Sequence, residues 1–224
     1  MAHRTACGWR VTAGPTRIPV MGRVFVLHTR IADGPVPQRL VELLERLPYA
    51  KRLELEWRDA RGRYSSLAGI ALVLAGAAAM CGRSAAATAL RFPAGERPRL
   101  AGGPFFSVSH GTRTVAVALS EATEIGFDLE DVPDERHDSP TVLADLERWT
   151  AVEAVVKAAG LGLRHAAEVQ LDPLLESATL SGDVYRLTPV TISAQVVAHL
   201  ATVVAVDSVV VTAFDPGQAA IPLT

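Results

Sequence analysis

Two acidic side chains near the middle of the sequence stand at a spacing that suits a hard metal cation. They are Asp128 and Glu130 of the segment IGFDLED, residues 125–131. Alternate residues of a β-strand share a face, so a strand here points both carboxylates the same way, and Gly126 on that face leaves room for a bulky group. Carboxylate oxygens are the ligands that Mg²⁺ and similar cations prefer. Taken alone, the segment is better explained as a solvated strand end.

A second segment, WTAVEAVVKAAGLGL at residues 149–163, places a glutamate and a lysine on one face of a predicted helix. Trp149, Glu153 and Lys157 follow each other at intervals of four residues. The alternative is a solvent-exposed Glu–Lys pair worth about 0.2–0.5 kcal/mol. Valines flank Glu153, which favours the edge of the core over open water. Of the 22 basic residues only Lys51 and Lys157 are lysines, which favours a role for a compact ammonium at Lys157.

A third segment, PFFSVSHG at residues 104–111, ends a predicted strand at a turn with Ser109 and His110. Side chains and backbone amides at such a turn can face a ligand, although a lone histidine there is more often structural or simply exposed. The sequence has no Ser, His and Asp order typical of hydrolases, and no G-x-x-x-x-G-K-[ST] phosphate-binding loop. It therefore favours neither a hydrolase nor a P-loop phosphotransferase.

In this order and at these separations, the three segments resemble the motifs of the 4′-phosphopantetheinyl transferase family, in its surfactin-type, single-chain branch. Fainter similarity lies at SSLAG (65–69) and ERP (96–98), and the resemblance covers residues 23–175. It implies an enzyme that moves the 4′-phosphopantetheine group of coenzyme A onto a serine of an apo acyl or peptidyl carrier protein and releases 3′,5′-ADP. It also implies dependence on Mg²⁺ or Mn²⁺, and a cytoplasmic monomer that serves fatty acid, polyketide or nonribosomal peptide biosynthesis.

By the same resemblance, three carboxylates hold the metal: Asp128, Glu130 and Glu153. Glu153 is also the expected base for the carrier serine, directly or through a metal-bound water, and Lys157 meets the phosphates, so these two are the expected catalytic residues. The residues expected to bind coenzyme A are Lys51, Arg52, Ser66, Arg97, Ser109, His110 and Lys157.

The sequence departs from the family pattern at two places. Val152 stands where the family often has a lysine just before the motif glutamate, and Arg97 of ERP stands where it usually has the lysine of Gly-Lys-Pro. The first departure leaves more of the charge neutralisation to Lys157. It also leaves open an alternative, a catalytically silent relative that binds coenzyme A or a carrier protein.

The elements that position these side chains mix helix with strand in the first part of the chain and are mostly strands in the second, so the class is α+β. The predicted strands are 23–31, 105–110, 113–120, 125–130, 169–171, 184–187, 191–199 and 203–214. Strands 105–110 and 113–120 form a hairpin across Gly111 and Thr112. The predicted helices are 38–47, an alanine-rich helix over 70–80 ending near Cys81, and 140–159, which Ser139 caps and Gly160 ends.

The chain is expected to have a loosely ordered N-terminal tail, residues 1–20, with Met21 as a candidate natural start. A Gly/Pro-rich connector, residues 93–104, divides the rest into an N-terminal half, 21–103, and a C-terminal half, 104–224, that holds the metal site. The resemblance implies that these halves are pseudo-symmetric, each a small, mainly antiparallel sheet packed with helices.

Composition excludes several classes of partner. The formal net charge is −2 and the pI is near 6.3, so no broad field attracts nucleic acid or a membrane surface. The longest uncharged run, residues 64–82, contains serines and glycines and falls short of about 20 apolar residues, so it predicts a buried helix and not a membrane span. Cys7 and Cys81 are expected to be reduced thiols of a cytosolic protein.

Overall fold

The computed structural model describes residues 22–81, 89–93, 96–136 and 139–217. The expected tail and Met21 lie outside these residues. The helices are α1 (Gln38–Arg46), α2 (Tyr49–Glu56), α3 (Ala60–Cys81) and α4 (Pro140–Ala159), with short 3₁₀ helices η2 (Asp134–Arg136) and η3 (Leu163–Glu168). The strands are β1 (Val24–Arg30), β2 (Leu90–Arg91), β3 (Arg99–Leu100), β4 (Phe105–His110), β5 (Thr114–Ser120), β6 (Ile125–Asp131), β7 (Gln170–Leu171), β8 (Ser177–Leu180), β9 (Asp183–Pro189), β10 (Val196–Thr202) and β11 (Val209–Ala213).

The strands form two main sheets and one small ribbon, which confirms the α+β class. The first sheet has the order β11-β1-β5-β4, the second has the order β6-β10-β9-β8-β7, and β2 pairs with β3. All of these pairs are antiparallel except β1 with β11, which run parallel with Val24 opposite Val209. The predicted hairpin is β4 and β5.

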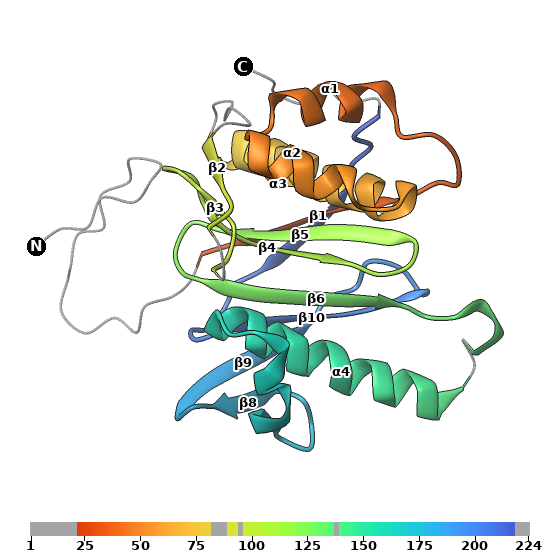
Figure 1. The fold of residues 1–224 in the computed structure, drawn as a ribbon. Helices are drawn as coiled ribbons and strands as arrows, with labels where there is room; N and C mark the ends of the chain where they lie inside the picture. The colour runs from red at the N-terminus through yellow and green to blue at the C-terminus, as the bar shows by residue number, and fades with distance from the viewer. Residues whose placement is uncertain (1–21, 82–88, 94–95, 137–138, 218–224) are drawn as a thin grey trace, which may run out of the picture.

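The two sheets pack against each other, and each has helices on its outer side. Figure 1 shows α1, α2 and α3 on one side of the first sheet, and α4 on the far side of the second. Three clusters of buried apolar residues fill these layers: one between α3 and the first sheet, one between the sheets, and one between the second sheet and α4. Strand β5 shows why the layers form, because Val115, Val117 and Leu119 join the first cluster while Ala116 and Ala118 join the second.

Helix α3 is the alanine-rich helix of the sequence. Among the described helices it is the one long and apolar enough to cross a membrane, and 67% of its most apolar window is buried inside the protein. Such burial is typical of the core helix of a soluble protein, as the sequence predicted. Cys81 at its end is disulfide-bonded, so the expectation of reduced thiols is wrong for this residue; its partner lies outside the described residues.

The structure differs from the predicted elements both before and after α4. Helix α2 and strands β2 and β3 were not predicted, and α3 begins at Ala60, ten residues before the predicted start. Strand β8 and the 3₁₀ helix η3 were not predicted, and residues 191–195 precede strand β10 instead of belonging to it. The predicted division at 103/104 separates β1 from β4, β5 and β11, the other strands of its sheet. The first sheet is therefore built from both predicted halves.

Candidate functional site

The site lies where the two sheets meet, along β4 and β6. These strands are side by side in space although they belong to different sheets. Because β4 and β6 are not paired by backbone hydrogen bonds, two serine hydroxyls of β4 link the strands instead. The amide of Phe127 donates to Ser107 Oγ at 3.0 Å, and the amide of Leu129 donates to Ser109 Oγ at 3.3 Å. The alternating serines of FSVSH thus join the sheets.

Asp128 lies on β6 between Phe127 and Leu129 and is buried, with 3% of the residue exposed. Its Oδ1 accepts a hydrogen bond from Ser109 Oγ at 2.6 Å and forms an ion pair with Lys157 Nζ at 2.5 Å. Lys157 Nζ lies 3.8 Å from Glu153 Oε2, one helical turn back on α4. The structure therefore brings together Asp128, Glu153, Lys157 and Ser109, and it excludes a solvated strand end for IGFDLED.

Helix α4 reaches this position because β6 carries a glycine beneath it. A Cβ on Gly126 would lie 1.9 Å from the carbonyl oxygen of Ala154 and 2.3 Å from the amide nitrogen of Ala158. The room that the sequence predicted beside Gly126 is thus filled by the backbone of α4. Helix α4 begins at Pro140 after Ser139 and ends at Gly160, whose φ is 72°, although the Ser139 side chain makes no capping hydrogen bond.

The carboxylates around Lys157 repel each other in a partly buried place. Burial, followed by the charges of Asp128 and Glu153, raises the pKa of Glu130 to about 6. Burial and then the charge of Asp128 also raise the pKa of Glu153, against the opposing effects of Lys157 and a hydrogen bond from Trp149. Asp128 therefore lies close enough to Glu130 and Glu153 to raise the pKa of both, and the three acids outnumber the one ammonium of Lys157.

One atom in this group lacks a partner. Asp128 Oδ2 is buried and makes no hydrogen bond with any residue that the structure describes. A buried carboxylate oxygen without a partner is costly, and a cation would supply one. Yet within the described ranges no group of three or more His, Cys, Asp or Glu side chains is arranged so that it could hold a metal ion. The ammonium of Lys157 lies near both Asp128 Oδ1 and Glu153 Oε2, so the cation present at these acids is the protein's own lysine. Carboxylate oxygens are the ligands that Mg²⁺ prefers, so Asp128, Glu130 and Glu153 fit that ion in ligand type.

Asp131, three residues after Asp128 on the same strand, shows what a satisfied carboxylate looks like. It is also buried, but Thr114 Oγ1 donates to its Oδ1 at 2.6 Å, and the amides of Arg113 and Thr114 donate to its Oδ2 at 2.7 and 3.0 Å. Gly111 lies against it, because a Cβ there would be 2.5 Å from Oδ2. Asp131 holds the β4–β5 turn, and of these two carboxylates Asp128 is the one with an oxygen that no described residue binds.

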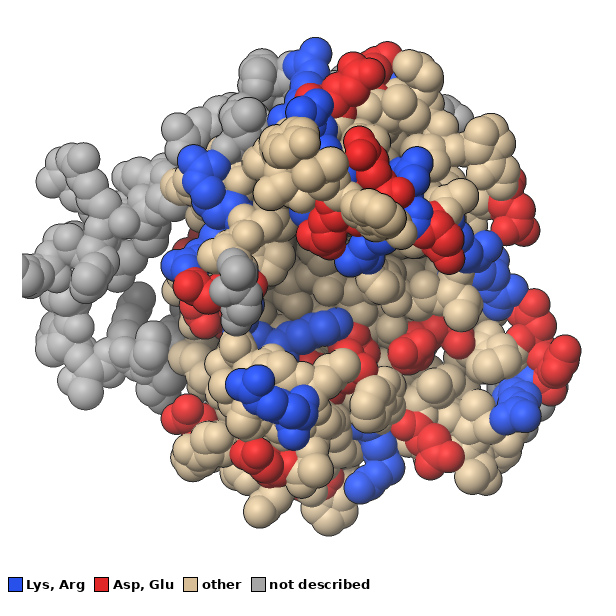
Figure 2. Space-filling model, viewed as in Figure 1, with Lys and Arg blue, Asp and Glu red and all other residues tan. Residues whose placement is uncertain are grey.

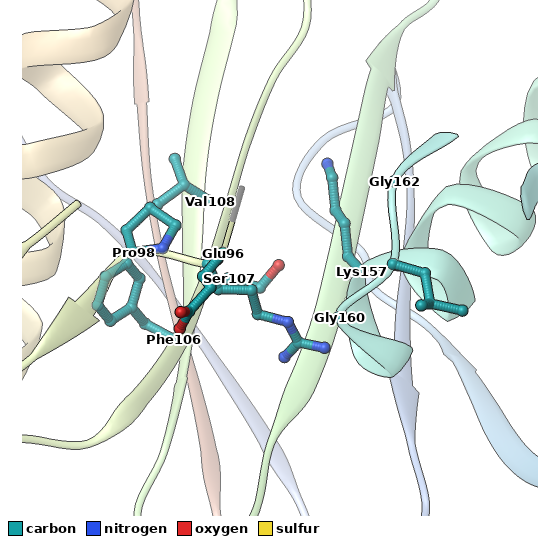
Figure 3. Close-up of a pocket in the computed structure, with 10 residues that line it drawn as sticks. Glu96, Pro98, Phe106, Ser107, Val108, Lys157, Gly160 and Gly162 are labelled. Carbon is teal, nitrogen blue, oxygen red and sulfur yellow. The ribbon is translucent and has the colours of Figure 1, made fainter. Parts of the chain in front are cut away.

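A cleft runs from Lys157 across the face of β4. One cavity of about 320 Å³ is lined on one side by Lys157, Gly160 and Gly162, and on the other by Pro98 and Phe106 (Figure 3). A second, of about 370 Å³, shares Arg97, Pro98, Phe106 and Gly160 with it. Figure 2 shows this side of the molecule hollowed between the upper helices and α4, with acidic and basic side chains adjoining at its lower rim.

The cleft continues into a third cavity of about 230 Å³, which shares Pro98, Phe106 and Val108 with the first. Its polar lining includes three residues predicted to bind coenzyme A: Lys51, Ser66 and His110. It also includes Arg58, which the sequence analysis missed. Arg58 donates to Ser66 Oγ at 3.1 Å and pairs with Glu54, which also pairs with Lys51. Two cations, a hydroxyl and an imidazole make this end suitable for phosphate.

Two predicted ligand-binding arginines are engaged by the protein itself. Arg97 donates to the carbonyl of Ala158 at the end of α4 and lies 3.5 Å from Glu124, so its guanidinium caps that helix while lining the cleft. Arg52 donates to the carbonyl of Glu45 at 3.5 Å, at the end of α1, and is not among the residues that line the cavities described above. Ser109 is 5% exposed and also contacts protein groups, not open space.

His199 is a further buried group that the sequence did not reveal. It lies opposite Asp128 in the β10–β6 pair, and its Nδ1 is 2.8 Å from Thr150 Oγ1. Because Thr150 Oγ1 donates to the carbonyl of Leu146 at 2.8 Å, the imidazole Nδ1 is the donor. Burial lowers the pKa of His199. A neutral histidine therefore fixes α4 to β10 next to the site.

Comparisons with known proteins add nothing to this geometry: no family model matches the chain, and no curated protein matches it.

Proposed function

We propose that the protein transfers the 4′-phosphopantetheine group of coenzyme A to a serine of an acyl or peptidyl carrier protein. One observation supports this most: Lys157, which pairs with Asp128 and lies 3.8 Å from Glu153, lines one end of a cleft. Lys51, Arg58 and His110 line the other end. Coenzyme A carries phosphates at two separate places, a pyrophosphate and a 3′-phosphate. A cleft with two phosphate-suited ends fits that pattern.

The acidic end suits the pyrophosphate only together with a divalent cation, because carboxylates alone repel phosphate. Asp128, Glu130 and Glu153 would hold Mg²⁺ or Mn²⁺, with the unpartnered Oδ2 of Asp128 as the donor that the fold leaves free. When bound, the cation offsets the charge of the pyrophosphate and of the departing 3′,5′-ADP. Lys157, released from Asp128, would then donate to phosphate oxygens.

The reaction needs an acceptor for one proton. The carrier serine Oγ forms a bond to the β-phosphorus, and the bond from that phosphorus to the bridging oxygen breaks, which releases 3′,5′-ADP. Glu153 accepts the serine proton in this proposal, because it is a partly buried carboxylate 3.8 Å from Lys157, which lines the cleft. Ser66 and Arg97 contribute to the walls of the nucleotide cleft.

The same proposal covers the finer features implied by the family resemblance. Each main sheet contacts one long helix, α3 or α4. In this proposal these two layers, and not the ranges 21–103 and 104–224, are the pseudo-symmetric halves, with coenzyme A in the cleft lined by β4 and the end of α4. A monomer in the cytoplasm, with an apo carrier protein as its partner and neither nucleic acid nor membrane, belongs to this proposal.

One experiment tests it. The protein is incubated with coenzyme A, Mg²⁺ and an apo carrier protein, and the carrier is weighed by mass spectrometry. We expect a phosphopantetheine mass gain that Asp128→Ala and Glu153→Ala abolish. Glu147→Ala is the matched control, because Glu147 is an exposed acid on the same helix. Coenzyme A binding without any mass gain would instead support a catalytically silent relative.

A further inference from the structure

The hydroxyl of Ser109 is used completely inside the protein. Its oxygen accepts from the Leu129 amide at 3.3 Å and from Lys157 Nζ at 3.2 Å, and its hydrogen goes to Asp128 Oδ1 at 2.6 Å. With 5% of the residue exposed, Ser109 has neither a free donor nor access to a ligand in the cleft. Its predicted role as a nucleotide contact therefore needs another explanation.

The contacts of Ser109 select one oxygen of Asp128. Ser109 and Lys157 both bind Oδ1, while Oδ2 is buried without a partner among the described residues. A carboxylate held by one oxygen keeps its χ angles, so the other oxygen stays aimed in one direction. Because Ser109 is also tied to the backbone of β6 through Leu129, the carboxylate is fixed relative to its own strand. Such preorganisation lowers the cost of binding a ligand at the free oxygen.

We propose that Ser109 is a positioning residue: it fixes Oδ1 of Asp128 so that Oδ2 is presented as the free donor for a divalent cation. The part that concerns the cation rests on the proposed function. The part that concerns Asp128 does not, because it is a property of the metal-free protein.

The chain supplies a matched control in Ser107. Both serines are buried on the same strand, and each accepts a backbone amide of β6, Phe127 for Ser107 and Leu129 for Ser109. The second contact of Ser107 is the carbonyl of Phe127 at 3.4 Å, and not a carboxylate. Ser107→Ala and Ser109→Ala therefore remove equivalent links between the sheets, but only Ser109→Ala also removes a hydrogen bond to Asp128 Oδ1.

The first measurement is a double-mutant cycle in EDTA, in which the stability of each variant is determined by urea unfolding. We expect Ser109→Ala and Asp128→Ala to be coupled by at least about tenfold in the folding equilibrium constant, since hydrogen bonds to charged groups are among the stronger ones. Ser107→Ala and Asp128→Ala should show less than about twofold coupling. Equal coupling in the two cycles overturns the proposal, whether or not the protein binds metal.

The second measurement is Mn²⁺ binding by calorimetry without coenzyme A. We expect Ser109→Ala to weaken Mn²⁺ binding by at least about tenfold, and Ser107→Ala to change it by less than about twofold. Equal weakening by both variants means that the seam, and not Asp128, controls the site, which overturns the proposal. If the wild-type protein binds no Mn²⁺ while the first cycle shows selective coupling, the proposed metal-dependent function fails and the positioning of Asp128 by Ser109 stands.

Discussion

Replacing Gly126 by alanine should push α4 away from β6 and take the site apart. The added Cβ would lie 1.9 Å from the carbonyl oxygen of Ala154, where ordinary contact begins at 3.4 Å, so the helix must retreat by about 1.5 Å. The 2.5 Å bridge from Lys157 to Asp128 would then lengthen to about 4 Å, the outer limit of an ion pair. The atoms that block the Cβ belong to the backbone of α4, so they cannot move aside as a side chain could. We therefore expect the free energy of unfolding to fall by at least about 3 kcal/mol.

For a chain of this length, that loss corresponds to a fall in Tm of about 6–12 °C. The assay is thermal and urea unfolding followed by circular dichroism. Gly162→Ala is the matched control, because its φ is −85° and a Cβ there meets nothing within 4 Å; it should be neutral or more stable by up to about 1 kcal/mol. A Gly126→Ala protein as stable as Gly162→Ala would refute the account of why α4 approaches β6.

Three further predictions concern single side chains. Lys157→Arg keeps the charge but cannot place a compact ammonium between Asp128 and Glu153, so transfer should slow at least about tenfold; a wild-type time course in the mass assay would contradict this. In EDTA, Glu130→Gln should raise Tm at pH 8 and change it little at pH 4, since the raised pKa of about 6 means that wild-type stability is lost as pH rises through that value; equal shifts at both pH values would speak against it. Asp131→Ala leaves the amides of Arg113 and Thr114 and the Thr114 hydroxyl without their acceptor and should lower the free energy of unfolding by about 3–5 kcal/mol, since each buried donor left unpaired costs about 1–3 kcal/mol. A loss below about 1 kcal/mol in urea unfolding would disprove its structural role.

Local patterns predicted the elements that carry the site. Alternation over IGFDLE identifies a strand with Ile125, Phe127 and Leu129 in the core, and these side chains fill the cluster between the sheets. The four-residue spacing of Trp149, Glu153 and Lys157 identifies one face of α4. Both patterns are readable because they depend on the period of a strand or a helix, which neighbouring residues define by themselves.

Contacts between distant segments could not be read in this way. The parallel pairing of β11 with β1 joins residues at opposite ends of the described chain, and no local pattern specifies it. Arg58 reaches the cleft from the turn between α2 and α3. Arg97 reaches the end of α4 because it donates to the carbonyl of Ala158, 61 residues further along the chain. Residue type predicted the charge of these two arginines, but not the groups that they contact.

The sequence by itself determined which side chains alternate on β6 and which lie in line on α4, because strand and helix periods are local properties. Only the tertiary structure decided that Gly126 admits a helix backbone, that Ser107 and Ser109 join two sheets, and that one oxygen of Asp128 is left without a partner. These are close packing effects between segments, and their outcome depends on distances of a few tenths of an ångström that no spacing in the sequence encodes.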